Sequence, residues 1–179
     1  MIFALRQPCR RFPSAIIDGV KRVVVLGPGA SGKSTLAMRL GEIAGLPVIE
    51  LDKVFWQPGL TATATRRDQW VAGQQQLVEK DTWIMDGDLG PYDAVEVRLR
   101  AADTVVLLDF SLLRCSWRAL LRSPERIDFW LWLWSYKYRS RPALMRMIAE
   151  HAPGATLRVL KNPGAVARFL TDLDYTFRE

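Results

Sequence analysis

The chain has 179 residues, of which 49% are hydrophobic and 25% are charged, and its formal net charge at pH 7 is +6. This composition excludes an intrinsically disordered chain, and the length favours one α/β domain that is large enough to bury a core. No apolar run approaches the roughly 18 residues of a membrane span, so we expect no membrane partner. A chain with only two cysteines fits a reduced, cytoplasmic setting.

The reactive side chains narrow the kinds of site that are expected. Cys9 and Cys115 do not make a disulfide framework, and His151 is a lone histidine, which argues against a metal site built from Cys and His. Most of the basic residues are arginines. Arginine suits nucleic acid, but it suits a polyphosphate ligand equally, because guanidinium groups bind phosphate bidentately.

Residues 1–19 form an extension ahead of the first predicted strand. They contain Arg6, Arg10 and Arg11 but no sustained apolar core, so they do not resemble a secretory signal. We expect either a disordered tail or an upstream start, followed by a single domain over residues 20–179.

The most informative stretch, residues 27–34, reads GPGASGKS and matches the pattern G-x-x-x-x-G-K-S/T in full. An apolar run at 22–26 predicts a buried parallel strand before it, and the apolar spacing after it predicts a helix to about residue 44. The expected nucleotide-binding residues of this P-loop are Gly27, Pro28, Gly29, Ala30, Ser31, Gly32, Lys33, Ser34 and Thr35.

The chemistry of the motif explains its residue types. The glycines let the backbone curl so that its N–H groups surround an anion, and the N-terminus of the next helix favours phosphate. Lys33 is placed to reach the outer phosphates, and the Ser34 hydroxyl suits Mg²⁺. The stretch therefore predicts a site for a nucleoside triphosphate.

Two acidic residues follow predicted strands. Residues 48–51 predict a strand that ends in Asp52, which would lie either near substrate or metal at the carboxyl edge of the sheet or at a helix cap. Residues 81–86 predict another strand that ends in Asp86. Asp86 is the favoured second acidic group near Mg²⁺, although an Asp-Gly turn also arises for conformational reasons alone. Residues 61–80 between them should be mostly helical.

The second half continues the alternation of strands and helices, with strands predicted at 104–108 and 156–160. From residue 111, Arg114, Arg118, Arg122 and Arg126 recur every four residues, so a continuous helix would bring them to one face, although Ser123-Pro124 predicts a break after Arg122. They either contact phosphate as a set or form a solvated surface. The Trp-rich residues 129–138 are interpreted as a broadly buried core helix, and further helices are expected at about 142–150 and up to 173.

These stretches together resemble a known family. The segments GPGASGKSTLAMRLGEIAGLPVIELDKVFWQPG, WIMDGDLG, ADTVVLLDF and ERIDFWLWLWSYKYRSRP are similar to the FlaR-like "topology modulation protein" group of the adenylate-kinase-like P-loop kinases. The resemblance implies a three-layer α/β fold with a five-stranded parallel sheet, as in adenylate and shikimate kinases. It also implies a substrate-binding helical insert at about 53–80 and a lid at about 122–127.

The same resemblance assigns roles by position. Arg118 would lie over the adenine ring, and Lys161, Asn162 and Pro163 would lie along its edge. Asp86 would serve Mg²⁺, and Arg122 would approach the phosphates. The candidate catalytic residues are Lys33, Arg122, Asp52 and Asp86, with Ser34 and Asp86 at the metal. The candidate acceptor-binding residues are Asp52, Phe55, Trp56, Arg66, Arg67, Arg98, Arg139 and Arg141.

The chain departs from the group in two places. Asp88 and Leu89 follow the Asp-Gly pair where the group has Asn-Tyr, and Ser123-Pro124 replaces a longer lid. A short lid excludes water less completely and supplies fewer arginines to the transition state.

The sequence thus predicts a kinase that transfers the γ-phosphoryl group of ATP·Mg²⁺ to a small acceptor, either a hydroxyl compound or a nucleoside monophosphate. One alternative is an ATP-binding regulatory module without transfer activity. Another is a nucleic-acid binder that uses the arginines, although nucleic acid is not the expected partner. A GTPase is disfavoured, because neither D-x-x-G nor N-K-x-D occurs in a suitable position.

Overall fold

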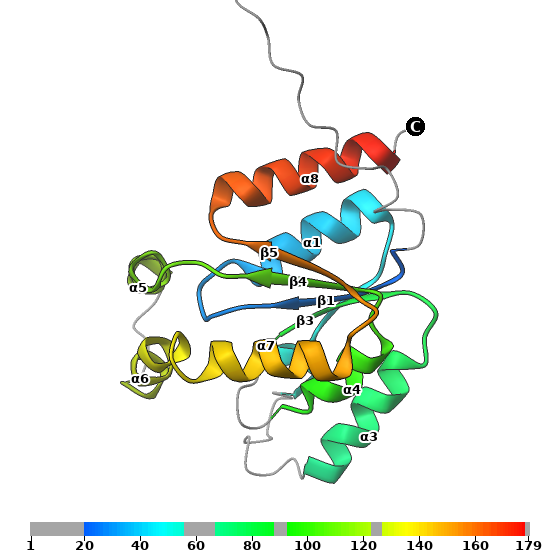
Figure 1. Ribbon diagram of the computed structural model, residues 1–179, viewed down its shortest axis with the longest axis horizontal. Helices are drawn as coiled ribbons and strands as arrows, with labels where there is room; N and C mark the ends of the chain where they lie inside the picture. Colours follow the sequence, from blue (N-terminus) through cyan, green and yellow to red (C-terminus); the bar gives the residue numbers. More distant parts are fainter. Residues whose placement is uncertain (1–19, 56–66, 88–92, 123–126, 178–179) are drawn as a thin grey trace, which may run out of the picture.

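The computed structural model describes residues 20–55, 67–87, 93–122 and 127–177. Its centre is a five-stranded parallel sheet in the order β2-β3-β1-β4-β5 (Figure 1). The strands are β1 (Arg22–Leu26), β2 (Val48–Glu50), β3 (Trp83–Asp86), β4 (Thr104–Leu108) and β5 (Thr156–Leu160). The expected α/β fold with five parallel strands is therefore confirmed.

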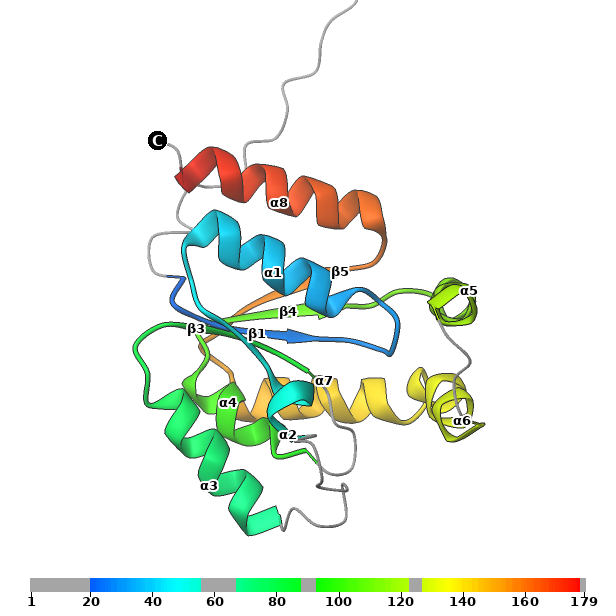
Figure 2. The same cartoon turned by 180° about the vertical axis from the view of Figure 1, so that it is seen from behind.

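Helices cover both faces of the sheet and give three layers (Figures 1 and 2). One face carries α1 (Lys33–Ala44) and α8 (Pro163–Phe177), and the other carries α3 (Arg67–Val78), α4 (Val95–Ala101) and α7 (Ser140–His151). Each central strand is buried on both sides, because its side chains alternate between the two faces. Val23 and Val25 pack with the α1 side, whereas Val24 and Leu26 pack with the α4 side.

The parallel arrangement brings the chemistry-bearing loops to one edge. Val25 of β1 pairs with Asp86 of β3, and Glu50 of β2 pairs with the same Asp86. The loops that leave these strands therefore begin side by side at the carboxyl edge, where open α/β sheets bind ligands. Two more helices, α5 (Leu112–Arg122) and α6 (Ile127–Tyr136), lie beyond this edge (Figure 1).

The second strand is shorter than expected. Helix α2 (Leu51–Phe55) starts directly after β2, so Asp52 lies in the first turn of a helix rather than at the end of a strand. The described part of the following helix begins at Arg67, and the earlier part of the expected insert, 56–66, lies outside the described residues. The predicted extension 1–19 and lid residues 123–126 also lie outside them.

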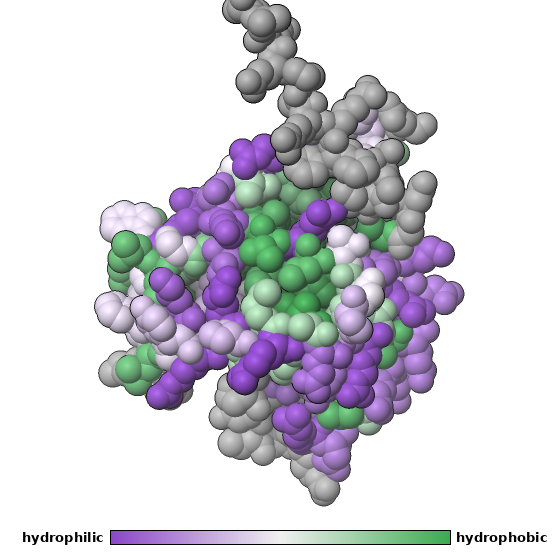
Figure 3. Space-filling view, in the orientation of Figure 1, coloured by the Kyte–Doolittle hydropathy of each residue, from purple (hydrophilic) through white to green (hydrophobic). Residues whose placement is uncertain are grey.

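The Trp-rich segment is the expected helix, α6, but the expectation that it is broadly buried is wrong. Leu133 and Tyr136 are buried, whereas Leu131 and Trp134 are 66% and 67% exposed. Leu113 and Trp117 of α5 are also exposed. Figure 3 shows hydrophobic (green) surface on the side of the molecule where α5 and α6 lie. Within the described residues, the helix packs mainly against α5 and α7. In the described parts of the chain, no helix has both the length and the apolar character to cross a bilayer.

Candidate functional site

The loop between β1 and α1 curls in the way its glycines predict. Gly27 and Gly32 have φ angles of 147° and 96°, and Ala30 has a φ angle of 57°. A Cβ atom on Gly27 would lie 2.6 Å from the Leu108 carbonyl oxygen, so only glycine fits against β4 at this position. The Ser31 N–H donates to the Pro28 carbonyl at 3.3 Å and closes the turn. This loop leads straight into the N-terminus of α1.

Lys33 is the first residue of α1 and turns back over the loop. Its Nζ donates a hydrogen bond to the Pro28 carbonyl oxygen at 3.1 Å. No acidic residue occupies the first turn of α1, so the helix dipole and the ammonium group add to a positive field at the loop. The combination of curled backbone, helix N-terminus and lysine can hold a polyphosphate.

Asp86 lies next to this loop at the end of β3. Its carboxylate accepts a hydrogen bond from the Ser34 side chain, yet its Oδ1 is buried without a hydrogen-bond partner among the described residues. Burial raises the pKa of Asp86 and the nearby Glu50 raises it further, while the Ser34 hydrogen bond, Lys33 and Arg98 oppose the rise. The Ser34 hydroxyl and the Asp86 carboxylate offer only oxygen ligands, and one of the carboxylate oxygens is unused. Such a pair suits Mg²⁺, which takes its remaining ligands from water and phosphate.

The burial of Asp86 leads to a stability prediction. A raised pKa means that the native state holds the proton more tightly than the unfolded chain does. Native stability therefore falls as the pH rises from the ordinary carboxyl pKa through the raised value, and it remains lower at pH 7. We therefore expect Asp86→Asn to increase the free energy of unfolding at pH 7, while it removes a candidate metal ligand.

Urea unfolding without Mg²⁺ at pH 7 and at pH 4 tests this prediction, and the gain should shrink at the lower pH. Asp81→Asn is the matched control, because the Asp81 side chain is fully exposed and makes only a 4.0 Å contact with Arg22. A loss of stability in Asp86→Asn at pH 7 would contradict the account given for the buried carboxylate.

A cavity of about 640 Å³ opens beside the loop. Ser31, Gly32 and Thr35 line it from the loop and α1, and Arg114 and Arg118 line it from α5. The Arg118 guanidinium lies directly over the loop, 3.4 Å from where a Cβ atom on Gly32 would be. Of the arginines expected to share one face of this helix, Arg114 and Arg118 both line the cavity. The side chain of Arg122 lies outside the described part of the chain.

One wall of the cavity runs along α8 from Pro163 to Asp174. Pro163 lines the cavity, and the Asn162 side chain caps α8 by accepting the Ala165 N–H at 2.9 Å. Lys161 and Asn162 are exposed. Of the three residues expected along an adenine edge, the structure therefore places Pro163 in the cavity wall and gives Asn162 a capping contact.

The first turn of α2 lies against the end of β3. A Cβ atom on Gly87 would lie 3.6 Å from Asp52 Oδ1, and Gly87 has a φ angle of 140°. Asp52 is exposed, so its carboxylate stands at the carboxyl edge beside Asp86 and can reach an incoming molecule. The structure places Asp52 in the first turn of α2 and next to Gly87, and its role toward substrate, metal or the helix end stays a prediction.

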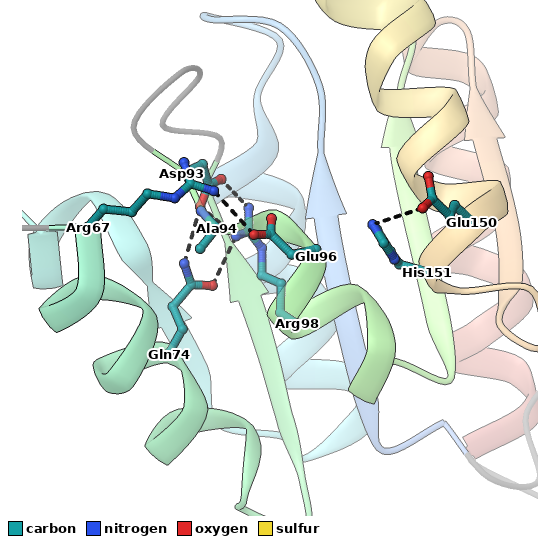
Figure 4. A network of polar contacts seen from close by, with 8 residues as sticks. All are labelled: Arg67, Gln74, Asp93, Ala94, Glu96, Arg98, Glu150 and His151. Carbon is teal, nitrogen blue, oxygen red and sulfur yellow. Dashed lines mark hydrogen bonds and ion pairs between the residues drawn. The ribbon is translucent and has the colours of Figure 1, made fainter.

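Arg98 has a different setting from the one expected of a residue that contacts an acceptor. Its side chain is completely buried, and both η nitrogens are engaged by Asp93 at 2.7 and 2.8 Å (Figure 4). The same guanidinium also donates to the Gln74 side chain at 3.1 Å and to the Gly87 carbonyl at 2.8 Å. Arg98 therefore ties α3 and α4 to the turn after Asp86, and its η nitrogens are not available to a ligand.

Two other expected acceptor-binding arginines also have carboxylate partners. Arg67 contacts Glu96 at 3.3 Å on the surface, and Arg141 makes a bidentate pair with Asp109, with both distances at 2.8 Å. Arg139 is exposed at the start of α7. Trp56, Arg66 and the side chain of Phe55 lie outside the described residues.

Sequence reasoning missed several residues around the site. Leu108 and Phe110 line the cavity, Asp109 holds Arg141, and Asp93 neutralises Arg98. Leu108 at the end of β4 and Phe110 just after it looked like ordinary core residues in the sequence. Asp93 and Arg98 are five residues apart, a spacing outside the usual three- and four-residue helical pairs, so no sequence pattern signalled the contact.

No protein-family model matches the chain, and no curated protein matches its sequence. The fold does resemble solved structures of small-molecule kinases. The shikimate kinase of Acinetobacter baumannii, solved with shikimate, is 17% identical over 90% of this chain and 94% of its own, with a TM-score of 0.61. A sugar kinase of Janibacter sp. HTCC2649 is 22% identical over 87% of this chain and 95% of its own, with a TM-score of 0.52. A gluconokinase of Sinorhizobium meliloti 1021 is 15% identical over 89% and 92%, with a TM-score of 0.52. At these identities the similarity shows the P-loop kinase fold.

Proposed function

We propose that the protein is a kinase of the FlaR-like group that transfers the γ-phosphoryl group of ATP·Mg²⁺ to a small acceptor. The observation that carries this proposal is the junction of the P-loop with β3, where Ser34 bonds to a buried carboxylate, Asp86, that keeps one oxygen unused. The kinase fold of the structural neighbours supports it.

In this proposal the chain supplies position and charge. The N–H groups of residues 27–34 and the N-terminus of α1 bind the phosphates, and Lys33 exchanges its bond to the Pro28 carbonyl for the outer phosphates. Ser34 and Asp86 would hold Mg²⁺, which neutralises phosphate charge when it is bound. Of these groups the Asp86 carboxylate is buried, which strengthens its attraction to a bound cation.

Asp52 is the group proposed to handle the acceptor. An acceptor hydroxyl oxygen bonds to the γ-phosphorus while the bond from that phosphorus to the β–γ bridging oxygen breaks and ADP leaves. The hydroxyl proton passes to the Asp52 carboxylate or through it to water. The exposure of Asp52 beside Gly87 supports this role, since a base must be accessible to its proton donor.

Arg118 is proposed to cover the nucleotide at the mouth of the P-loop. We expect Arg118→Met to weaken ATP binding about tenfold, because a guanidinium against the loop contributes charge and stacking to a bound nucleotide. Calorimetric titration with a non-hydrolysable ATP analogue measures the change. Arg146→Met is the control, since Arg146 is exposed on α7, across the sheet from the cavity. If Arg118→Met and Arg146→Met bound the ATP analogue with equal affinity, Arg118 would not contact the nucleotide.

The test of the proposed function is ADP release from MgATP in the presence of a panel of nucleosides, nucleoside monophosphates and polyols. Acceptor-stimulated ADP release together with a phosphorylated product by mass spectrometry supports a kinase. Tight ATP binding without stimulation by any acceptor favours the regulatory module instead. DNA binding that ATP does not compete away, and that falls steeply with salt, would favour the nucleic-acid binder.

A further inference from the structure

We propose that the α5–α6 face binds to the surface of a bilayer that contains anionic phospholipids. This face consists of the exposed apolar side chains of the two helices and of the turn after α6: Leu113, Trp117, Leu120, Leu121, Leu131, Trp134 and Tyr138. The attachment is separate from the proposed phosphotransfer. It also requires no spanning helix, because amphipathic helices can lie in the plane of the membrane interface.

The apolar side chains of α5 gather on its outer side. A helix advances about 100° per residue, so the four exposed apolar residues of α5 fall within an arc of about 100°. The buried residues of the helix, Cys115 and Ala119, lie on the opposite side. The exposed arc is therefore not the side by which α5 packs onto the domain, and Leu113 within it is 84% exposed.

Helix α6 adds to the same part of the surface. Leu131 and Trp134 are exposed, whereas Leu133 and Tyr136 are buried on the other side of the helix. The two helices contact each other beyond the carboxyl edge of the sheet, as Figures 1 and 2 show. Among the described residues, eleven large apolar side chains are exposed, and seven of them belong to the α5–α6 face. This concentration distinguishes the face from single exposed apolar residues, which are normal on a protein surface.

The residue types of the face suit the boundary between headgroups and acyl chains. Leucine side chains can enter the acyl region. Trp117, Trp134 and Tyr138 each combine an apolar ring with one polar atom, and such rings favour the level of the headgroups. Helices that lie in a membrane interface have this composition on one side and arginine or lysine on the other.

The charge around the face favours an anionic surface. Residues 112–139, from the start of α5 to the turn after α6, contain six basic and two acidic residues, a net charge of +4 against +6 for the whole chain. Arg114 and Arg118 lie beside the apolar arc and line the P-loop cavity, whereas Lys137 and Arg139 are exposed after α6. Anionic headgroups attract such a segment. A second copy of the chain would bring the same positive charge against it, which opposes self-association through this face.

The test is sedimentation of the full chain with two kinds of vesicle, one of phosphatidylcholine alone and one of phosphatidylcholine and phosphatidylserine in equal parts. We expect the chain to bind the mixed vesicles at least about tenfold more tightly than the neutral ones. The binding should weaken as salt is added, because salt screens the attraction to the headgroups.

Replacing one tryptophan on each helix tests the face itself. Trp117→Ser combined with Trp134→Ser should weaken binding to the mixed vesicles at least about tenfold, because it removes two large apolar side chains from the interface. The melting temperature should change little, since both side chains are exposed. The matched control is Met38→Ser, which removes an apolar side chain that is 48% exposed on α1 and should leave vesicle binding as in the parent protein.

A single lysine tests the role of charge. Lys137→Gln should weaken binding to the mixed vesicles about threefold and leave binding to the neutral vesicles unchanged. Lys80→Gln is the control, because Lys80 is an exposed lysine beyond the end of α3. Equal losses in the two variants would mean that the overall charge of the chain, and not this face, attracts the vesicles.

Two vesicle results would overturn the inference: no binding of the full chain to the mixed vesicles, or equally tight binding by the variant that lacks both tryptophans. Sedimentation velocity without vesicles tests the other occupant. A dimer that the same double replacement dissociates would mean that a second copy of the chain, and not a membrane, covers the α5–α6 face.

Discussion

Lys33→Ala is expected to lower the rate of acceptor-stimulated ADP release at least about a thousandfold. Lys33 stands at the first position of α1 and turns its Nζ to the Pro28 carbonyl at 3.1 Å, directly over the loop that would hold the phosphates. No other described lysine lies at this loop. Its charge is needed most in the transition state, where negative charge spreads over the transferred phosphoryl group, so kcat should fall more than ATP affinity.

A coupled assay for ADP and a calorimetric titration with an ATP analogue separate the two effects. Lys80→Ala, at an exposed lysine beyond the end of α3, should behave as the parent protein does. The melting temperature of Lys33→Ala should stay within a few degrees, because the group makes one partly buried hydrogen bond. If the Lys33→Ala variant transferred phosphate at the parental rate, the P-loop would have no part in phosphoryl transfer.

The sequence predicted those parts of the site whose residues are consecutive. The P-loop is one unbroken stretch, so its motif fixes the turn, the strand before it and the helix after it together. The five strands were also predictable, because buried parallel strands appear as short apolar runs such as residues 104–108. Asp86 could be found for the same reason, since it ends such a run.

Contacts between distant segments could not be predicted in this way. Arg98 looked like a free cation because its partner Gln74 is reached only when α3 and α4 pack together, and its other partner, Asp93, lies just before α4 at a spacing that no helical pattern signals. Arg141 and Asp109 are 32 residues apart, and only the meeting of α7 with the end of β4 joins them. Local patterns report which face a residue occupies, but the choice of partner depends on tertiary packing.

Helix α6 shows the other limit. Its alternating Trp and Leu residues are apolar all round, and such a pattern favours full burial. The structure buries Leu133 and Tyr136 but leaves Leu131 and Trp134 exposed, because the neighbours of the helix in the described part of the chain are mainly α5 and α7. Periodicity carries no information about how many neighbours a helix at the edge of a domain will have.

Arg98→Met is expected to lower the free energy of unfolding by about 3–5 kcal/mol, because it leaves the buried Asp93 carboxylate without its counter-charge. Its bond to the Gly87 carbonyl is lost as well, which loosens the turn after Asp86. Urea unfolding at pH 7 measures the change. Arg67→Met is the matched control on the neighbouring helix, where the pair with Glu96 is largely exposed and should contribute less than about 1 kcal/mol.

The roles of Arg98 as a buried tie and as an acceptor ligand predict opposite patterns. A guanidinium that bound the acceptor would raise KM on replacement and leave unfolding nearly unchanged. If Arg98 instead stabilises the fold through its buried ion pair with Asp93, the effects of replacing the two residues depend on each other. The double variant Arg98→Met, Asp93→Asn should then lose less stability than the sum of the losses in the two single variants, with a coupling energy of about 1–3 kcal/mol. Additive effects of the two replacements would mean that the ion pair does not join them. Coupling of that size would instead explain why a cation that the sequence places near the acceptor is withheld from it: its charge is already used to hold the turn that presents Asp86.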